Sequence, residues 1–255
     1  MSACTICKSD TLKYYRTIRN ELKIYECLTC LNAITLPPPN DIAYEEDDFH
    51  GQFNFNSLDE LPRQWKKALV KQINLIKRRV KPGANILEIG CGQGLLLQEL
   101  KTIGYNTFGV EPSKTAYQIA EKKGLAILNG YFPETNFNQQ EFDLIIMSQV
   151  LEHIENPLDF LSILGKMYPG KYLMLIQSNY KGIVPQKNQE KWYAWLPEQH
   201  YSHFTAKGLQ QICKMLGFTY TDFEYSTLEH NDYWLSRISE FIPCTADQLH
   251  CLIKL

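Results

Sequence analysis

The hydrophobic residues of this 255-residue chain follow two alternating rhythms from about residue 58 onward. Between residues 58 and 80 they recur at intervals of three and four, which predicts an amphipathic helix to about Arg79, ended by Pro82 and Gly83. Shorter hydrophobic runs then alternate with further helical patterns. The runs predict strands at 86–89, 107–110, 126–128, 142–147, 171–177 and 218–225, with helices at 95–103, 113–123, 156–167 and 205–216.

This alternation of strands and helices predicts a doubly wound, Rossmann-like α/β fold with a seven-stranded, mostly parallel sheet. In such a fold, ligands bind at the carboxyl ends of the strands. The C-terminal part has weaker patterns, which predict a helix over 233–241 and a final edge strand over 249–254.

The N-terminal 36 residues have a different organisation. Residues 12–25 alternate like a short hairpin between two Cys-x-x-Cys pairs, formed by Cys4, Cys7, Cys27 and Cys30. Two such pairs supply the four thiolates of a closed, structural Zn²⁺ site, although four ordinary thiols are the alternative. We therefore predict a small zinc ribbon over 1–36 that serves folding or docking rather than catalysis.

Two segments are candidates for lids. A proline-rich linker opens residues 37–57, and the acidic, aromatic stretch 41–56 is either a solvated loop or a lid. Within the main domain, expected over 58–255, residues 179–203 form a long aromatic stretch that we expect to be irregular and to line a substrate pocket. Its Trp and Tyr residues suit a ring-shaped acceptor, and they equally suit ordinary packing.

Composition narrows the class of partner. A formal net charge of −2 gives no basic footprint for nucleic acid. The chain has no hydrophobic stretch of membrane length and no signal-like start, so we expect a cytoplasmic protein. Its eight cysteines are then metal ligands or buried thiols rather than disulfides. The oligomeric state cannot be read from the sequence.

The main chemical signal follows the strand at 86–89. Gly90, Gly92 and Gly94 are spaced as a tight turn where the backbone takes positive φ or touches a ligand. Glu88 precedes this turn, and Glu111 stands at the end of the next predicted strand, where a carboxylate accepts hydrogen bonds from a ribose diol.

Together with residues 142–154, these motifs resemble the class I S-adenosylmethionine-dependent methyltransferases over residues 58–225, and residues 200–205 and 216–218 resemble a subgroup that acts on small molecules. Some members of that subgroup, including certain sugar methyltransferases, also carry an N-terminal pair of Cys-x-x-Cys motifs. The resemblance implies that S-adenosyl-L-methionine is held by Glu88, Gly90, Gly92, Gly94, Glu111, Gly130, Tyr131, Ser148 and Gln149.

The acceptor side is expected around two histidines. His200 is the candidate base, since imidazole titrates near working pH, and a packing role is its alternative. His153 is either a substrate contact or a structural residue. Sugar C-methyltransferases have Glu directly before the corresponding His and Tyr three before it, whereas Gln199 and Pro197 stand here. We therefore expect transfer to a hydroxyl of a small molecule, such as a sugar, phenol or polyketide-like metabolite.

Two other functions are compatible with the sequence. An RNA or protein methyltransferase could use the ribbon to dock its substrate, although the acidic balance and the absence of an Asn/Asp-Pro-Pro-Tyr turn after residue 147 argue against amino-group methylation of bases. The second alternative is a protein that binds S-adenosylmethionine without catalysis.

Overall fold

The computed structural model describes residues 3–18, 22–39, 55, 57–192, 194–196, 198–228 and 246–255. The chain divides into two compact units. One holds residues 42–148 and 171–174, and the other holds residues 1–41, 149–170 and 175–255. Most of the expected lid (41–56) and the expected helix over 233–241 lie outside the described residues. The domain boundaries at residues 36 and 57 stay a prediction.

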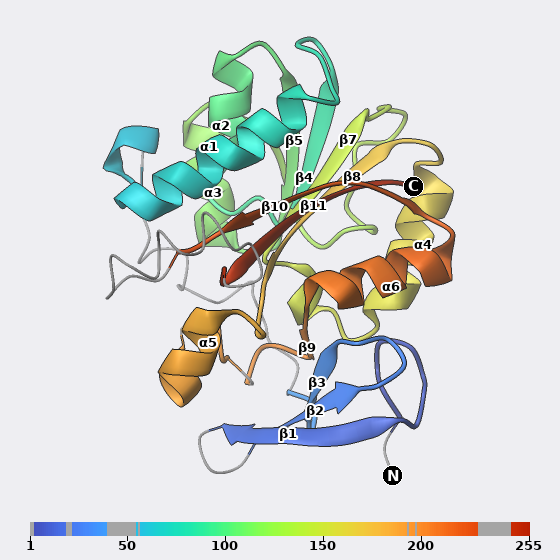
Figure 1. Cartoon of the computed structure of the whole chain (residues 1–255). Coiled ribbons are helices and arrows are strands. Elements are labelled where there is room, and N and C mark those ends of the chain that lie inside the picture. Colours follow the sequence, from blue (N-terminus) through green and yellow to red (C-terminus); the bar gives the residue numbers. More distant parts are fainter. Residues whose placement is uncertain are drawn as a thin grey trace. The chain divides into compact units, whose positions relative to one another are not determined.

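The unit built around residues 42–148 follows the predicted alternation of strands and helices (Figure 1). A 3₁₀ turn (Leu58–Glu60) precedes α1, which begins after Pro62 and is therefore shorter than the predicted helix. Strand β4 pairs in parallel with β5 on one side and β7 on the other, and β5 pairs with β6. The elements are α1 (Arg63–Lys77), β4 (Asn85–Ile89), α2 (Leu95–Thr102), β5 (Asn106–Glu111), α3 (Lys114–Lys122), β6 (Ala126–Asn129) and β7 (Leu144–Ser148).

Local chemistry sets the helix ends in this unit. The Ser113 hydroxyl accepts from the Ala116 N–H at 3.3 Å and caps α3, as predicted.

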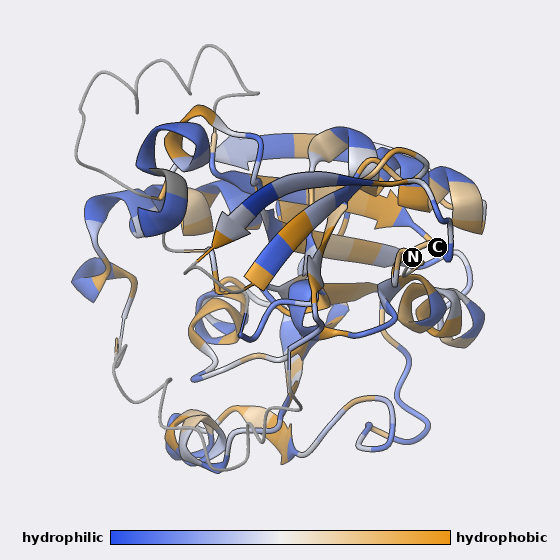
Figure 2. Cartoon of the chain, turned by 90° about the horizontal axis from the view of Figure 1, so that it is seen from below, coloured by the Kyte–Doolittle hydropathy of each residue, from blue (hydrophilic) through white to orange (hydrophobic). Residues whose placement is uncertain are grey.

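The helices carry hydrophilic and hydrophobic residues on different sides, seen as blue and orange along each ribbon in Figure 2. Strands β4 and β7 are almost wholly buried, as expected of parallel strands covered on both faces.

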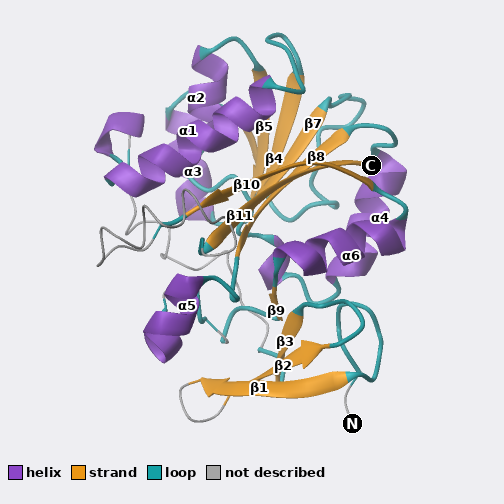
Figure 3. Cartoon of the chain, viewed as in Figure 1, coloured by secondary structure: helices purple, strands orange, loops and turns teal. Residues whose placement is uncertain are grey.

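The other unit contains the ribbon and the C-terminal half of the chain (Figure 3). The predicted hairpin is confirmed by the antiparallel pair β1 and β2. Strand β3 continues this sheet and pairs with β9, which lies about 170 residues later in the chain. The elements are β1 (Leu12–Ile18), β2 (Leu22–Cys27), β3 (Ala33–Leu36), η3 (Leu151–His153), α4 (Pro157–Met167), α5 (Ile183–Asn188), η4 (Gln189–Lys191), β9 (Ser202–His203), α6 (Ala206–Leu216), β10 (Thr219–Ser226) and β11 (Gln248–Lys254).

Two helix starts differ in how they are stabilised. Thr205 caps α6 as expected, because its hydroxyl accepts from the Gly208 N–H at 2.9 Å. Asn156 stands at the expected N-cap of α4, but its side chain makes no capping bond and accepts from the Lys8 ammonium instead. The sequence identifies the start of α4 correctly and misses this contact with the ribbon.

Seven strands form one mostly parallel sheet in the order β10-β11-β8-β7-β4-β5-β6, with β8 spanning Tyr172–Ser178, which confirms the predicted fold class. The final strand was predicted as an edge strand, and this is wrong. Strand β11 lies between β8 and β10, and its antiparallel pairing with β10 covers residues 248–254. Residues 248–253 are all buried, which fits an interior strand.

The expectation of an irregular stretch over 179–203 is wrong in part. Residues 183–191 are helical, and residues 202–203 form β9. None of the described helices has both the length and the hydrophobicity needed to cross a membrane.

Candidate functional site

The glycine turn after β4 has the backbone geometry that the sequence predicts. Gly90, Gly92 and Gly94 have φ values of 68°, 53° and 73°, the left-handed region that side chains disfavour. At Gly94, which precedes α2, a Cβ atom would lie 2.3 Å from Leu125 Cδ1. The Gly90 N–H is held by the Val110 carbonyl at 2.8 Å. The turn therefore presents main chain rather than side chains.

Two buried carboxylates flank this turn. Glu88, at the end of β4, is 4% exposed, and its Oε2 has no hydrogen-bond partner among the described residues. Burial raises the pKa of Glu88 to about 8, and the nearby charge of Glu111 adds to the shift. Such a group is stabilised by a cationic ligand, which would restore its ionised form.

Glu111 closes β5 and is held firmly by the backbone. Its Oε2 accepts from the Gly92 N–H at 2.7 Å, and its Oε1 accepts from the Ser113 N–H at 2.8 Å. Each carboxylate oxygen has a second lone pair, so both can also accept from a diol. A cationic ligand with an amino group and a ribose fits this pair of acids, which is the chemistry of S-adenosylmethionine.

The other expected cofactor residues follow β6 and β7. Gly130, after β6, has φ 146° and donates its N–H to the Glu111 carbonyl at 3.1 Å, while Tyr131 is 41% exposed. Ser148 ends β7. Gln149 has φ 54°, an unusual value for a residue with a side chain, and its Oε1 accepts from the Ser178 hydroxyl at 2.7 Å.

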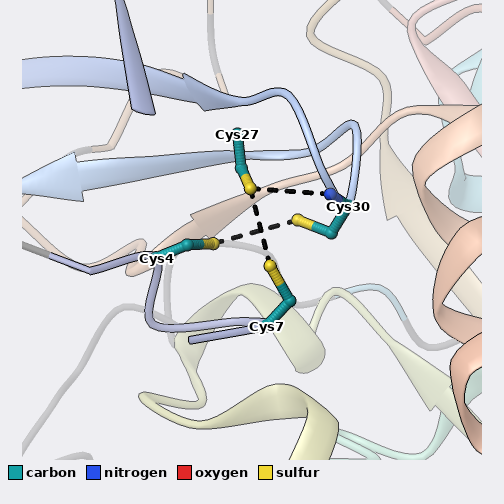
Figure 4. A group of neighbouring side chains, drawn as sticks. All are labelled: Cys4, Cys7, Cys27 and Cys30. Atoms are coloured by element: carbon teal, nitrogen blue, oxygen red, sulfur yellow. Dashed lines mark hydrogen bonds between the residues drawn. The ribbon is translucent and has the colours of Figure 1, made fainter. Parts of the chain in front are cut away.

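The four ribbon cysteines converge on one point (Figure 4). Cys4 Sγ lies 3.8 Å from Cys30 Sγ, and Cys7 Sγ lies 3.5 Å from Cys27 Sγ. Four sulfurs placed about 2.3 Å from one tetrahedral ion would be about 3.8 Å apart. The spacing is too long for disulfides and fits a shared Zn²⁺. These two distances are compatible with the expected ion, and all four sulfurs lie within 4.8 Å of one another.

A second cluster joins Glu152 and His153 of η3 to His200. Their nearest side-chain ligand atoms all lie within 4.8 Å of one another, and the rings of His153 and His200 meet edge to face at 4.6 Å. His200 is 5% exposed, and burial holds its pKa well below the usual range, with His153 and His203 adding to the effect. His200 is therefore a neutral imidazole at pH 7.

The tautomers of this cluster follow from its carbonyl partners. His200 Nδ1 lies 3.1 Å from the Ala194 carbonyl, and His153 Nδ1 lies 3.2 Å from the Gln199 carbonyl. A carbonyl only accepts, so Nδ1 carries a proton in both rings, and in the neutral ring of His200 the lone pair is on Nε2. The Glu152 carboxyl belongs to the same cluster.

A small cavity of about 10 Å³ lies beside Glu152, Gln177, His200 and Ser202, with room for about one water or one hydroxyl group. The carboxyl of Glu152, the amide of Gln177 and the hydroxyl of Ser202 are buried and make no hydrogen bond of normal geometry in the described part of the chain, although Gln177 lies near enough to Glu152 to act on its pKa. Burial raises the pKa of Glu152 to about 8. Unsatisfied polar groups around such a space call for a polar occupant.

The aromatic residues of 179–203 have a packing role. Tyr180, Trp192 and Trp195 are at most 2% exposed and form one cluster with Ile18 and Ile24 of the ribbon strands. Tyr180 also donates its hydroxyl to Glu26 at 3.3 Å. These side chains therefore join the loop to the ribbon, and Tyr180 and Trp192 also line the small cavity beside His200, so packing and pocket-lining roles coexist.

The sequence proposed the two histidines and the four cysteines as site residues and did not propose three polar residues that lie near the histidines. Glu152 stands directly before His153, and an acid within a hydrophobic segment was the available signal. Gln177 and Thr35 lie in strands that read as ordinary buried segments. The structure groups residues 88–148 of the expected cofactor set in one unit, with Gln149, His153, His200 and the cysteines in the other.

Comparison with known proteins adds a family. A family profile described as a methyltransferase domain matches residues 58–222. The mitochondrial ubiquinone biosynthesis O-methyltransferase of Schizosaccharomyces pombe is 32% identical over 108 residues, which are 39% of each chain. The ubiquinone biosynthesis O-methyltransferase of Pelagibacter ubique is 31% identical over 144 residues, 52% of this chain and 58% of that one. The chain thus spans less than two thirds of either relative.

Solved structures share the fold at lower identity. A SAM-dependent methyltransferase from Archaeoglobus fulgidus superposes with a TM-score of 0.56 and 19% identity, covering 74% of this chain and 94% of that one. An S-adenosylmethionine-dependent methyltransferase from Mesorhizobium loti gives the same TM-score with 14% identity, covering 78% of this chain and all of that one.

Proposed function

The chain belongs to the methyltransferase domain family, and from this premise we propose that it transfers a methyl group from S-adenosylmethionine to a hydroxyl of a small-molecule acceptor. The observation that carries the proposal is the pair of buried acids, Glu88 and Glu111, beside a turn of three left-handed glycines. A buried carboxylate with a raised pKa and no partner on one oxygen is suited to a cation.

In this proposal the residues of the glycine turn hold the cofactor. Glu88 would bind its ammonium group and Glu111 its ribose hydroxyls, while Gly90, Gly92 and Gly94 would let the main chain approach it. Gly130 and Tyr131 would border the adenine, with Ser148 and Gln149 near the sulfonium. When bound, the cofactor would supply an activated methyl group for transfer to the acceptor oxygen.

The histidine cluster provides the acceptor chemistry. His200 would accept the proton that the acceptor hydroxyl loses, on Nε2, because its Nδ1 already donates to the Ala194 carbonyl and its lowered pKa keeps the ring neutral at pH 7. Glu152, when ionised, stabilises the imidazolium, since its carboxylate lies in the same cluster. His153 would either contact the acceptor or hold the His200 ring in place, since the two rings meet edge to face at 4.6 Å. Exclusion of water and alignment supply the remaining rate enhancement.

The names of the relatives support oxygen as the acceptor atom, since both are called ubiquinone biosynthesis O-methyltransferases. The proposed acceptor class is a sugar, phenol or polyketide-like metabolite. In the ribbon, Cys4, Cys7, Cys27 and Cys30 would hold a structural Zn²⁺, which is supported by their clustering within 4.8 Å of one another.

The test combines calorimetry with a transfer assay. The protein is titrated with S-adenosylmethionine and then incubated with the methyl-labelled cofactor and a panel of hydroxylated metabolites and RNA. We expect tight cofactor binding and label in a small molecule. His200→Ala should lower turnover with nearly unchanged cofactor affinity, and Tyr14→Ala, an exposed ribbon residue, is the matched control. Label in RNA or protein, or binding without any transfer, would refute the proposal.

A further inference from the structure

The ribbon strand β3 pairs with the segment that follows His200 and ends at His203. Ala33 pairs with His203 and Ile34 with Ser202 in antiparallel register. The next residue, Thr35, donates its N–H to the Tyr201 carbonyl at 3.1 Å. The strand therefore fixes the backbone of residues 201–203 from the ribbon side.

The Thr35 side chain reaches further into the same site. Thr35 is 1% exposed, and its hydroxyl donates to the His200 carbonyl at 2.7 Å. The same oxygen lies 3.0 Å from His203 Nε2. One side chain thus contacts both histidines of the segment, although it belongs to a strand that is about 165 residues away in sequence.

Proton counting at this hydroxyl determines the tautomer of His203. Threonine has a single O–H, and the carbonyl of His200 can only accept, so the hydroxyl proton is used there. The hydroxyl oxygen must then accept from His203, whose Nε2 carries the proton. Burial lowers the pKa of His203 to about 3, so at pH 7 the ring has only this one N–H and its Nδ1 carries a lone pair.

A second contact ties the metal-binding turn to the end of this segment. Asn32, two residues after Cys30, accepts from the Thr205 N–H at 3.2 Å, and its amide donates to the Cys30 carbonyl at 3.1 Å. Gly208 of α6 packs so closely that a Cβ atom would lie 1.8 Å from the Asn32 side chain. The segment from His200 to Thr205 is therefore held by the ribbon at both of its ends.

We propose that Thr35 is a positioning residue, which sets the tautomer of His203 and holds the His200 backbone so that the His200 ring keeps Nε2 as its basic nitrogen. The ribbon is then part of the acceptor site rather than an appendage that only docks a partner. The spectroscopic part of this inference is independent of the proposed function, and its kinetic part rests on it.

The experiment measures histidine tautomers in the full chain by NMR. Protein labelled with ¹⁵N-histidine is recorded at pH 7 with correlations that distinguish Nδ1–H from Nε2–H. The wild type should show Nε2–H for His203 and Nδ1–H for His200. Thr35→Val should remove Nε2–H as the dominant form of His203, whereas Thr35→Ser, which keeps the hydroxyl, should restore it.

Thr221→Val is the matched control, because the Thr221 hydroxyl also donates to a backbone carbonyl, that of Leu252 at 2.8 Å, in strand β10. It should leave both histidine tautomers unchanged. Nδ1–H as the dominant form of His203 in the wild type would overturn the proposal, whether or not any variant folds. A Thr35→Val protein with wild-type tautomers would overturn it as well.

A kinetic comparison completes the test once an acceptor is known. Thr35→Val should lower kcat by up to about 100-fold, because the backbone of His200 would no longer be held in position. Cofactor affinity should be unchanged, and Thr35→Ser should recover most of the rate. If the tautomers shift as expected and no methyl transfer is found with any acceptor, the proposed function fails and the positioning role of Thr35 stands.

Discussion

Replacing Glu88 by Gln tests whether the Glu88 carboxyl loses a proton when the cofactor binds. With a folded pKa of about 8, the Glu88 carboxyl is about nine-tenths protonated at pH 7 in the cofactor-free protein. A bound cation favours the carboxylate, so binding should expel this proton. The amino group of the ligand, with an ordinary pKa of about 7.7–8.0, takes up about 0.1–0.2 proton in return. We therefore expect a net release of about 0.8 proton for each cofactor bound.

The same shift has a consequence for stability. The ordinary pKa of a glutamate is near 4.5, so between pH 4.5 and 8 the folded chain holds a proton that the unfolded chain has lost. Stability then falls as pH rises through this window, by about 1.4 kcal/mol per pH unit and about 3 kcal/mol by pH 7. Glu88→Gln removes this cost and should make the cofactor-free protein more stable at pH 7 while it weakens cofactor binding.

The assay is calorimetry at pH 7 in buffers with different ionisation enthalpies, where the slope of the binding enthalpy gives the protons released. Glu88→Gln should reduce the release to about zero, and Glu99→Gln, on α2 after the same turn, should leave it unchanged. Thermal unfolding without cofactor at pH 5 and pH 8 measures the stability arm. Equal proton release by the wild type and Glu88→Gln would refute the reasoning.

Three further predictions concern other parts of the chain. Metal analysis should find about one zinc per chain, lost in Cys30→Ser and kept in Cys213→Ser, which changes a buried thiol outside the cluster; loss in both variants would contradict the site. Gly94→Ala should destabilise the protein by about 1–3 kcal/mol from backbone strain alone, and by more because its Cβ would lie 2.3 Å from a leucine methyl. Gly124→Ala, at φ 71° with nothing within 4 Å of a Cβ atom, should show the backbone contribution only. Equal losses of stability in the two variants would rule out the packing contribution. Turnover should rise with pH through about 8, because the raised pKa of Glu152 leaves its carboxylate fully formed only above that value, and Glu152→Gln should abolish this limb of the pH profile.

The sequence predicted the parts of this molecule that depend on local chemistry. Periodicity located the strands on either side of the glycine turn, and the Ser113 and Thr205 caps follow from short-range bonding preferences. The four cysteines and both histidines were identified because their residue types and spacing carry the signal. The sequence alone predicted that the four cysteines lie together, because the two pairs share one motif. It could not predict that Glu152 lies near His200, because these residues are far apart in the sequence.

What the sequence could not provide depends on contacts between distant segments. Strand β11 appeared as an edge strand because its hydrophobic pattern does not state which neighbour it pairs with. Helix α5 was missed because residues 183–188 contain Pro185 and have only a short pattern. The role of Thr35 has no local signal at all, since it comes from pairing with a segment about 165 residues later.

The pairing of β3 with β9 has a consequence for engineering the acceptor specificity of this chain. A new acceptor loop grafted onto this chain would meet a ribbon strand whose register, hydroxyl and hydrophobic face are matched to the old loop. The segments around β3 and β9 therefore act as one structural unit despite their separation in sequence. Chimeras that exchange both segments should fold and keep their histidine geometry, whereas those that exchange the loop alone should lose it.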